Sequence, residues 1–270
     1  MEFKLGCKPT PLESRNRMLR MSDYIKTPEF LVHPASWDWG KIVRVPWGMD
    51  GNGPDTQNPD LAPCGDCVLA DIAHETMIYT ALSGKIYVPS AREVVAAYSE
   101  ITGYDPNKTD GEGNNPTDNG TTWGQALSWW RKKGFGGNTI GAYVSIDPTN
   151  VNHINAALYW FGPLSTAISV YAFMEEDFNA GKDWVIPEGW DVNAVLGGHG
   201  VPLTAFSNWG RSYDFVTWGK ATRMSGNCRY GVQLEVYAKI DSAFVTDRKP
   251  APNGFSMQQL VDDLAKVKAR

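Results

Sequence analysis

The sequence predicts an α+β protein, because helical patterns fill the first half of the chain and strand patterns follow in the second half. Four helices are expected at residues 67–82, 90–102, 123–133 and 152–161. Four strands are expected at residues 164–171, 201–206, 213–218 and 232–240. This order favours antiparallel strands covered by helices, and the 270 residues are enough to bury a substantial core.

Residues 67–82 carry the strongest helical pattern, since nearly every position in them is apolar. Their polar stripe consists of Asp71, Glu75 and Tyr79, at i, i+4, i+8 spacing. A helix with so narrow a polar face is expected to be mostly buried. A Gly- and Pro-rich loop at 50–63 precedes it, and Gly84 ends it.

Local signals support the other elements. Ser90 and Glu93 form a capping box at the start of the second helix. Residues 232–240 alternate between apolar and polar side chains, which predicts a strand with one apolar and one polar face. Pro202 has no backbone N–H, so the strand at 201–206 is expected to be an edge locally.

The chain is expected to have three parts. Residues 1–36 are dotted with prolines and basic in the middle, which indicates an arm that lies on another surface. Residues 37–240 form the main domain. Residues 241–270 form a polar tail that ends in an amphipathic helix at 256–269.

Composition narrows the classes of partner. The net charge of −5 gives no indication of a nucleic-acid partner. No apolar run has the length of a signal peptide or of a membrane span, so we expect synthesis in the cytoplasm, no signal peptide and no membrane partner. Four cysteines in a chain of this kind argue against a disulfide scaffold.

Cys67 and His199 are the candidate reactive pair. Cys67 stands in the first turn of the buried helix, where the helix dipole and free N–H groups favour a thiolate and provide donors for an oxyanion. A nucleophilic thiol also needs a base. His199 follows two glycines and opens an apolar strand, which places an imidazole at a strand edge beside small residues.

Residues 64–68 read Cys-Gly-Asp-Cys-Val, and His199 lies 132 residues after Cys67 (199 − 67). This resembles the papain-like cysteine peptidases, whose signature C-G-[SA]-C-[WY] precedes a histidine by about 130–150 residues. The resemblance implies a central helix carrying Cys67, packed on an antiparallel β-sheet or half-barrel that carries His199. The Gly-Asp-Cys-Val helix start and the Gly-Gly-His strand are also similar to those of a group of phage and bacterial papain-like proteins.

Further landmarks follow in the order of that family. Trp37-Asp38-Trp39 resembles the start of the mature enzymes. The loop containing Gly120 resembles the glycine-lined loop that holds extended substrate backbone. The motif Thr217-Trp218-Gly219 resembles the strand end whose tryptophan shields the catalytic pair. The resemblance therefore implies a substrate role for Gly120 and a shielding role for Trp218.

One departure concerns the residue that orients the histidine. The family has an asparagine two residues before the motif tryptophan, and this chain has Val216 there. Asp214 is on the same face of that strand, and a shift or bulge would let it take over as the third catalytic residue.

A second departure concerns the oxyanion site. The family has a glutamine six residues before its cysteine, and this chain has Leu61 there. Because the preceding loop is long, Asn52, Gln57 or Asn58 is the expected side-chain donor in its place.

The sequence also contains partial patterns for dithiol redox chemistry, zinc ligation and calcium binding. Cys64 and Cys67 form a C-x-x-C at a helix start, as in dithiol redox proteins, although no βαβ pattern surrounds it. Zinc ligation by Cys64, Cys67, His74 and Cys228 lacks paired spacing in the second half. The acidic loop from Asp105 misses the EF-hand register. We therefore expect no metal and no cofactor.

The sequence leaves three functions open. The first is a cysteine peptidase or amidase that hydrolyses a peptide or peptidoglycan amide through Cys67 and His199. The second is a weak or inactive papain-like structural protein that decorates a phage virion and binds virion proteins or its own copies through residues 1–36 and 241–270. The third is a dithiol redox protein that uses Cys64 and Cys67.

Overall fold

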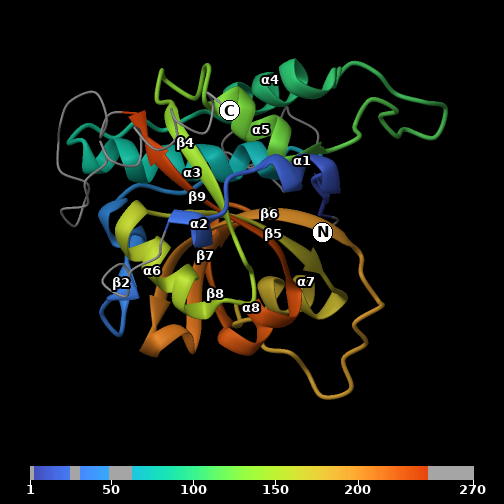
Figure 1. Ribbon diagram of the computed structural model, residues 1–270. Coiled ribbons are helices and arrows are strands. Elements are labelled where there is room, and N and C mark those ends of the chain that lie inside the picture. Colours follow the sequence, from blue (N-terminus) through green and yellow to red (C-terminus); the bar gives the residue numbers. More distant parts are fainter. Residues whose placement is uncertain (1–2, 25–30, 49–62, 243–270) are drawn as a thin grey trace.

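The computed structural model describes residues 3–24, 31–48 and 63–242. Figure 1 shows helices α3, α4 and α5 on one side of the molecule and β5 to β8 on the other, with β4 and β9 reaching up to the level of α3 and with α6, α7 and α8 around the strands. The helices are α1 (Leu12–Arg17), α2 (Met21–Tyr24), α3 (Cys67–Leu82), α4 (Ala91–Thr102), α5 (Trp123–Trp130), α6 (Val151–Phe161), α7 (Ala172–Asn179), α8 (Gly226–Val232) and the 3₁₀ turns η2 (Gly40–Ile42) and η3 (Asn208–Gly210). The strands are β1 (Cys7–Lys8), β2 (Trp37–Asp38), β3 (Thr121–Thr122), β4 (Ile140–Ile146), β5 (Leu164–Val170), β6 (Gly197–Ser207), β7 (Ser212–Thr217), β8 (Lys220–Ser225) and β9 (Gln233–Asp241).

The predicted α+β class is confirmed. The main sheet has the order β4-β9-β5-β6-β7-β8 with antiparallel neighbours, and β2 adds to it beside β6. The capping box of Ser90 and Glu93 is present at the start of α4. Strands β4 and β8 and the short helices α7 and α8 were not predicted. In β4 the alternation was readable, because every second residue from Ile140 to Ile146 is buried.

Helix α3 is the centre of the fold, and its predicted burial is confirmed. Every residue from Cys67 to Tyr79 is buried, including the expected polar stripe. Glu75 lies in a buried polar cluster, where Lys239 Nζ is 2.5 Å from its carboxylate and Ser165 Oγ donates to it at 2.6 Å. Burial, followed by the charge of Glu75, raises the pKa of Asp71, which lies one turn earlier in the same helix.

Strand β9 departs from the prediction of one apolar and one polar face. It lies between β4 and β5, and both of its faces are covered. The polar side chains of Glu235, Tyr237 and Lys239 are buried, whereas Leu234, expected on the apolar face, is 45% exposed. Three of these side chains have internal partners, because Tyr237 donates to Glu235 at 2.6 Å and Lys239 binds Glu75.

Strand β6 is not paired with β7 at Pro202, close to the candidate histidine. Pro202 pairs with Ser165 of β5, whereas the pairing of β6 with β7 starts one residue later, at Leu203. The local edge predicted at Pro202 is therefore confirmed on the β7 side. This leaves the segment around His199 free of β7 pairing, so the end of β7 is available for side-chain contacts with it.

The N-terminal segment packs on the body at several points. β1 pairs in parallel with β3, through Cys7 opposite Thr121 and Lys8 opposite Thr122. Further along, the backbone N–H of Ser145 donates to Leu19 O at 2.8 Å. The predicted tail helix at 256–269 lies outside the described residues. Among the helices of the described residues, none has the length and apolar character of a membrane span.

Candidate active site

Strand β6, which carries His199, crosses the first turn of α3, which begins at Cys67. The backbone N–H of Gly200, the residue after His199, donates to Cys67 Sγ at 3.3 Å. Gly200 permits this approach, because a Cβ there would lie 3.0 Å from the Cα of Val68. Both Cys67 and His199 are 1% exposed. The thiol of Cys67 therefore contacts the backbone of the residue that follows His199, and both side chains are buried.

Thr217 and Trp218 hold the imidazole of His199. Nε2 of His199 is 2.8 Å from Thr217 Oγ1, and the indole of Trp218 stacks on the ring at 5.1 Å with 23° between the planes. Nδ1 is buried and has no hydrogen-bond partner among the described residues. Burial lowers the pKa of His199 to about 3, so the ring is neutral. The neutral ring has its free nitrogen available for a proton.

The orienting role predicted for Asp214 is corrected by this geometry. Asp214 binds Arg223 of β8, with contacts of 2.6 and 3.0 Å. Successive side chains of a strand point to opposite faces, so Thr217 lies on the opposite face from Asp214 and Val216. The prediction placed the orienting group on the wrong face of β7, whereas the hydroxyl directly before Trp218 in the sequence indicates Thr217.

The thiol of Cys67 is also neutral in this conformation. Burial raises its pKa to about 12, and backbone hydrogen bonds from Gly200 and Gly6 offset only part of that effect. A neutral thiol is a poor nucleophile. The position at the start of the 16-residue helix α3 nevertheless provides first-turn N–H groups that the helix itself does not use.

The N-terminal segment from Phe3 to Lys8 covers the site; we call this segment the strap. Phe3 stacks on Trp218 at 3.9 Å, so that Trp218 lies between Phe3 and His199. Leu5 packs over Gly197, where a Cβ would lie 2.9 Å from its Cδ1. The burial of the cysteine and histidine is thus produced in part by the chain's own N-terminal residues.

Gly6 is the tightest point of the strap. A Cβ on Gly6 would lie 1.9 Å from Gly65 O, and a Cβ on Gly120 would lie 2.2 Å from Gly6 O. The carbonyl of Gly6 accepts from Thr121 N at 2.8 Å. The loop around Gly120, for which a substrate role was predicted, contacts the backbone of the strap.

The carboxylate of Asp118 positions the two loops that contact Gly6. Asp118 accepts from Gly65 N at 3.0 Å and from the hydroxyl of Tyr98 at 2.7 Å. The same Tyr98 hydroxyl accepts from Gly120 N at 2.7 Å. This network links the loop before Cys67 to the loop before β3, and the sequence reasoning missed both Asp118 and Tyr98 as positioning residues.

The sequence also suggested other residues for an oxyanion, redox or metal site. Asn52, Gln57 and Asn58 lie outside the described residues. Cys64 is a free buried thiol whose pKa is raised by burial, and Cys67 is also free. His74 is buried, and burial lowers its pKa to about 4. Within the part of the chain that the structure describes, no three His, Cys, Asp or Glu side chains gather as a metal site.

Comparisons with known proteins bear on the fold. No family model and no curated protein sequence matches the chain. Solved structures do match. Xylellain, a cysteine protease from Xylella fastidiosa, aligns with a TM-score of 0.63 at 12% identity, over 89% of this chain and 98% of that chain.

Two proenzyme structures align as well. The procathepsin B from Trypanosoma congolense has a TM-score of 0.55 at 12% identity, over 88% of this chain and 86% of that chain. The procathepsin L 3 from Tenebrio molitor larval midgut has a TM-score of 0.54 at 16% identity, over 83% and 74%. At these identities the similarity concerns the fold. The chain therefore has the fold of the papain-like cysteine proteases.

Proposed function

We propose that this chain is a cysteine peptidase or amidase that hydrolyses a peptide or peptidoglycan amide bond, with Cys67 as nucleophile and His199 as base and acid. The observation that supports it most is the hydrogen bond from Gly200 N to Cys67 Sγ, which places the thiol next to the histidine segment. The proposed parts are an arm at 1–36, a catalytic domain at 37–240 and a tail at 241–270.

The reaction proceeds in two acyl-transfer steps. His199 takes the proton of the Cys67 thiol, and the sulfur attacks the amide carbonyl carbon. First-turn N–H groups of α3, with Asn52, Gln57 or Asn58, stabilise the oxyanion. His199 then gives the proton to the leaving amine, which leaves an acyl group on the sulfur. A water molecule, deprotonated by His199, releases the acid and restores the thiol.

Thr217 and Trp218 keep the imidazole in position during these steps. The hydroxyl of Thr217 fixes Nε2, which leaves Nδ1 for the proton of the thiol. Trp218 covers one face of the ring and excludes water from it. Alignment of this kind contributes directly to rate, because a histidine that samples several rotamers is seldom placed for proton transfer.

The conformation described here is a closed form of the proposed enzyme. Substrate backbone needs the edge of β3 and the space beside Cys67, and the strap occupies both. Displacing the strap would hydrate the site. Hydration lowers the pKa of Cys67 and raises that of His199, because burial is the main cause of both shifts. Both changes favour the thiolate–imidazolium pair.

The test is hydrolysis of a fluorogenic peptide library and of peptidoglycan by the intact chain and by a strap-released variant such as Gly6→Ala. We expect cleavage by the released form, and its loss in Cys67→Ala and His199→Ala versions of that form. Absence of cleavage, together with iodoacetamide labelling of Cys67 no faster than that of a free cysteine, would exclude the peptidase.

A non-catalytic role is the second candidate. The observation that favours it is the complete burial of Cys67 and His199 beneath the strap. In that case residues 1–36 and 241–270 bind neighbouring virion proteins or copies of the chain, and the papain-like body is a scaffold. Deletion of residues 1–25 would then impair assembly, whereas for the peptidase it would change activity.

A further inference from the structure

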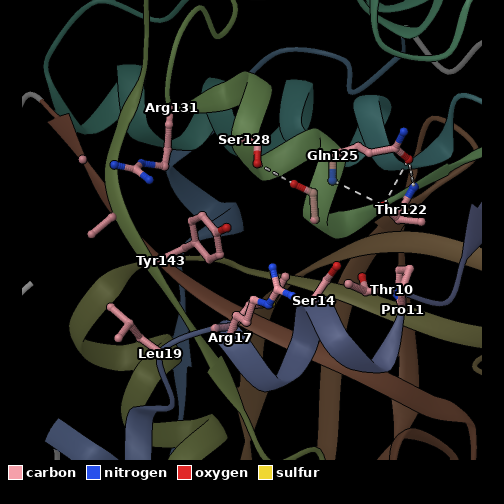
Figure 2. A pocket seen from close by; sticks show the side chains of 14 residues that line it. Thr10, Pro11, Ser14, Arg17, Leu19, Thr122, Gln125, Ser128, Arg131 and Tyr143 are labelled. Carbon is pink, nitrogen blue, oxygen red and sulfur yellow. Dashed lines mark hydrogen bonds between the residues drawn. The ribbon is translucent and has the colours of Figure 1, made fainter. Parts of the chain in front are cut away.

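A cavity of about 900 Å³ lies between the N-terminal arm and the body, and neither Cys67 nor His199 lines it. Figure 2 shows it from close by: α1 forms one wall, α5 the opposite wall, and β4 with Tyr143 the third. The volume is at the upper end of the range of small-molecule sites, about 300–1,000 Å³. Six of the 14 residues that line it belong to the same arm that carries the strap.

The arm is fixed on both sides of this cavity but stands away from the body between them. Before α1, the pairing of β1 with β3 and a 2.7 Å bond from Thr10 N to Glu235 hold it. After α1, Leu19 O accepts from Ser145 N at 2.8 Å. The helix itself has no buried residue. The arm is therefore held to the body before and after α1, whereas the residues of α1 itself are not buried against the body.

The cavity is positively charged. Arg17 of α1 and Arg131 at the end of α5 reach it from opposite walls, and no Asp or Glu lines it. Neither arginine forms an ion pair with any residue that the structure describes. In a chain of net charge −5, two unpaired arginines in one hollow are a local excess of positive charge.

The chemistry of the walls selects the ligand class. A guanidinium binds carboxylate and phosphate oxygens with two parallel N–H donors. Ser14 adds a hydroxyl donor, and Tyr143 and Leu19 provide apolar surface for an organic body. A small organic anion meets each of these requirements.

We propose that this cavity binds a small organic anion bearing carboxylate or phosphate groups, and that the bound anion holds the arm, and with it the strap, on the cysteine site. The linkage follows from the origin of the two arginines, since Arg17 belongs to the arm and Arg131 to the body. A ligand that contacts both binds the closed form better than the open form, and so shifts the population toward closure. The inference does not depend on peptidase activity.

The binding test uses the full chain with citrate and pyrophosphate as probes at constant ionic strength, chloride serving as the reference anion. We expect a saturable rise in Tm and a calorimetric Kd, and the stronger probe distinguishes carboxylate from phosphate ligands. Arg17→Gln and Arg131→Gln should each weaken binding at least about tenfold, as for a lost charged hydrogen bond.

Arg15→Gln is the matched control, because Arg15 belongs to the same helix but lines a different hollow. It should keep the wild-type Kd. Failure of both probes to saturate, or equal weakening by Arg15→Gln and Arg17→Gln, would overturn the site.

The linkage is tested by the rate at which iodoacetamide modifies Cys67, followed by mass spectrometry. Saturating anion should slow this modification in the wild-type chain and leave it unchanged in Arg17→Gln. If the anion binds but the rate in the wild-type chain does not fall, the anion does not control the strap.

Discussion

Replacing Gly6 by Ala should open the strap. The new Cβ would lie 1.9, 2.3 and 2.4 Å from the O, C and Cα atoms of Gly65, all of them backbone atoms. Gly65 is held in turn by Asp118, so the wall does not yield easily. The strap must shift instead, and overpacking of this kind costs about 1–3 kcal/mol. That cost raises the open population by about 5- to 150-fold.

The assay is the rate of iodoacetamide modification at Cys67. In the closed form the thiol is buried, so the observed rate is proportional to the open population, and we expect the same about 5- to 150-fold acceleration. Two controls separate strap release from general loosening. Lys4→Ala changes an exposed side chain of the strap, and Gly111→Ala adds the same methyl group at a position with no atom within 4 Å.

Both controls should modify at the wild-type rate. A Gly6→Ala protein that reacts no faster than these controls, while retaining its fold by circular dichroism, would refute the view that the strap limits access to the thiol.

Three further predictions follow from the site and the core. In the Gly6→Ala background, Thr217→Val should lower the reactivity of Cys67 at least about tenfold by leaving the imidazole unheld, while Thr217→Ser retains it; labelling kinetics decide this. Burial raises the pKa of Cys67 to about 12 in the closed form. The iodoacetamide labelling rate of the wild-type chain should therefore still increase at about pH 10, because the thiolate fraction is still growing there. The labelling rate of Gly6→Ala should level off at a lower pH. Glu75→Gln should cost about 3–5 kcal/mol in urea unfolding, because it leaves Lys239 buried without its partner, and the double variant Glu75→Leu/Lys239→Met should cost less. A double variant that is no more stable than Glu75→Gln would contradict the last of these.

The sequence alone predicted the features that depend on local periodicity. The buried helix α3 and the capping box of Ser90 follow from spacing within single segments. The spacing of Cys67 and His199 also pointed to the papain-like fold. A local pattern encodes which face of a segment is apolar, and this was enough to select the α+β class. The local motifs and their spacing were enough to select Cys67 and His199 as candidates.

Strand β9 shows where periodicity stops being sufficient. Its polar face was readable, but its place between β4 and β5 was not. The position in the sheet decides whether a polar face meets water or a partner, and here Lys239 meets Glu75 of α3, 164 residues away in sequence. An ion pair between residues so far apart in sequence cannot be predicted from the hydrophobic periodicity of either segment.

The site depends even more on the tertiary structure. Choosing Thr217 over Asp214 required knowledge of which face of β7 meets His199. The placement of Phe3 on Trp218 and of Gly6 beside Cys67 required the path of an arm whose sequence has no strong pattern. The sequence selected the candidate pair, whereas the tertiary structure decided which groups hold these residues and whether they are accessible, because orientation and access are set by contacts between segments far apart in the chain.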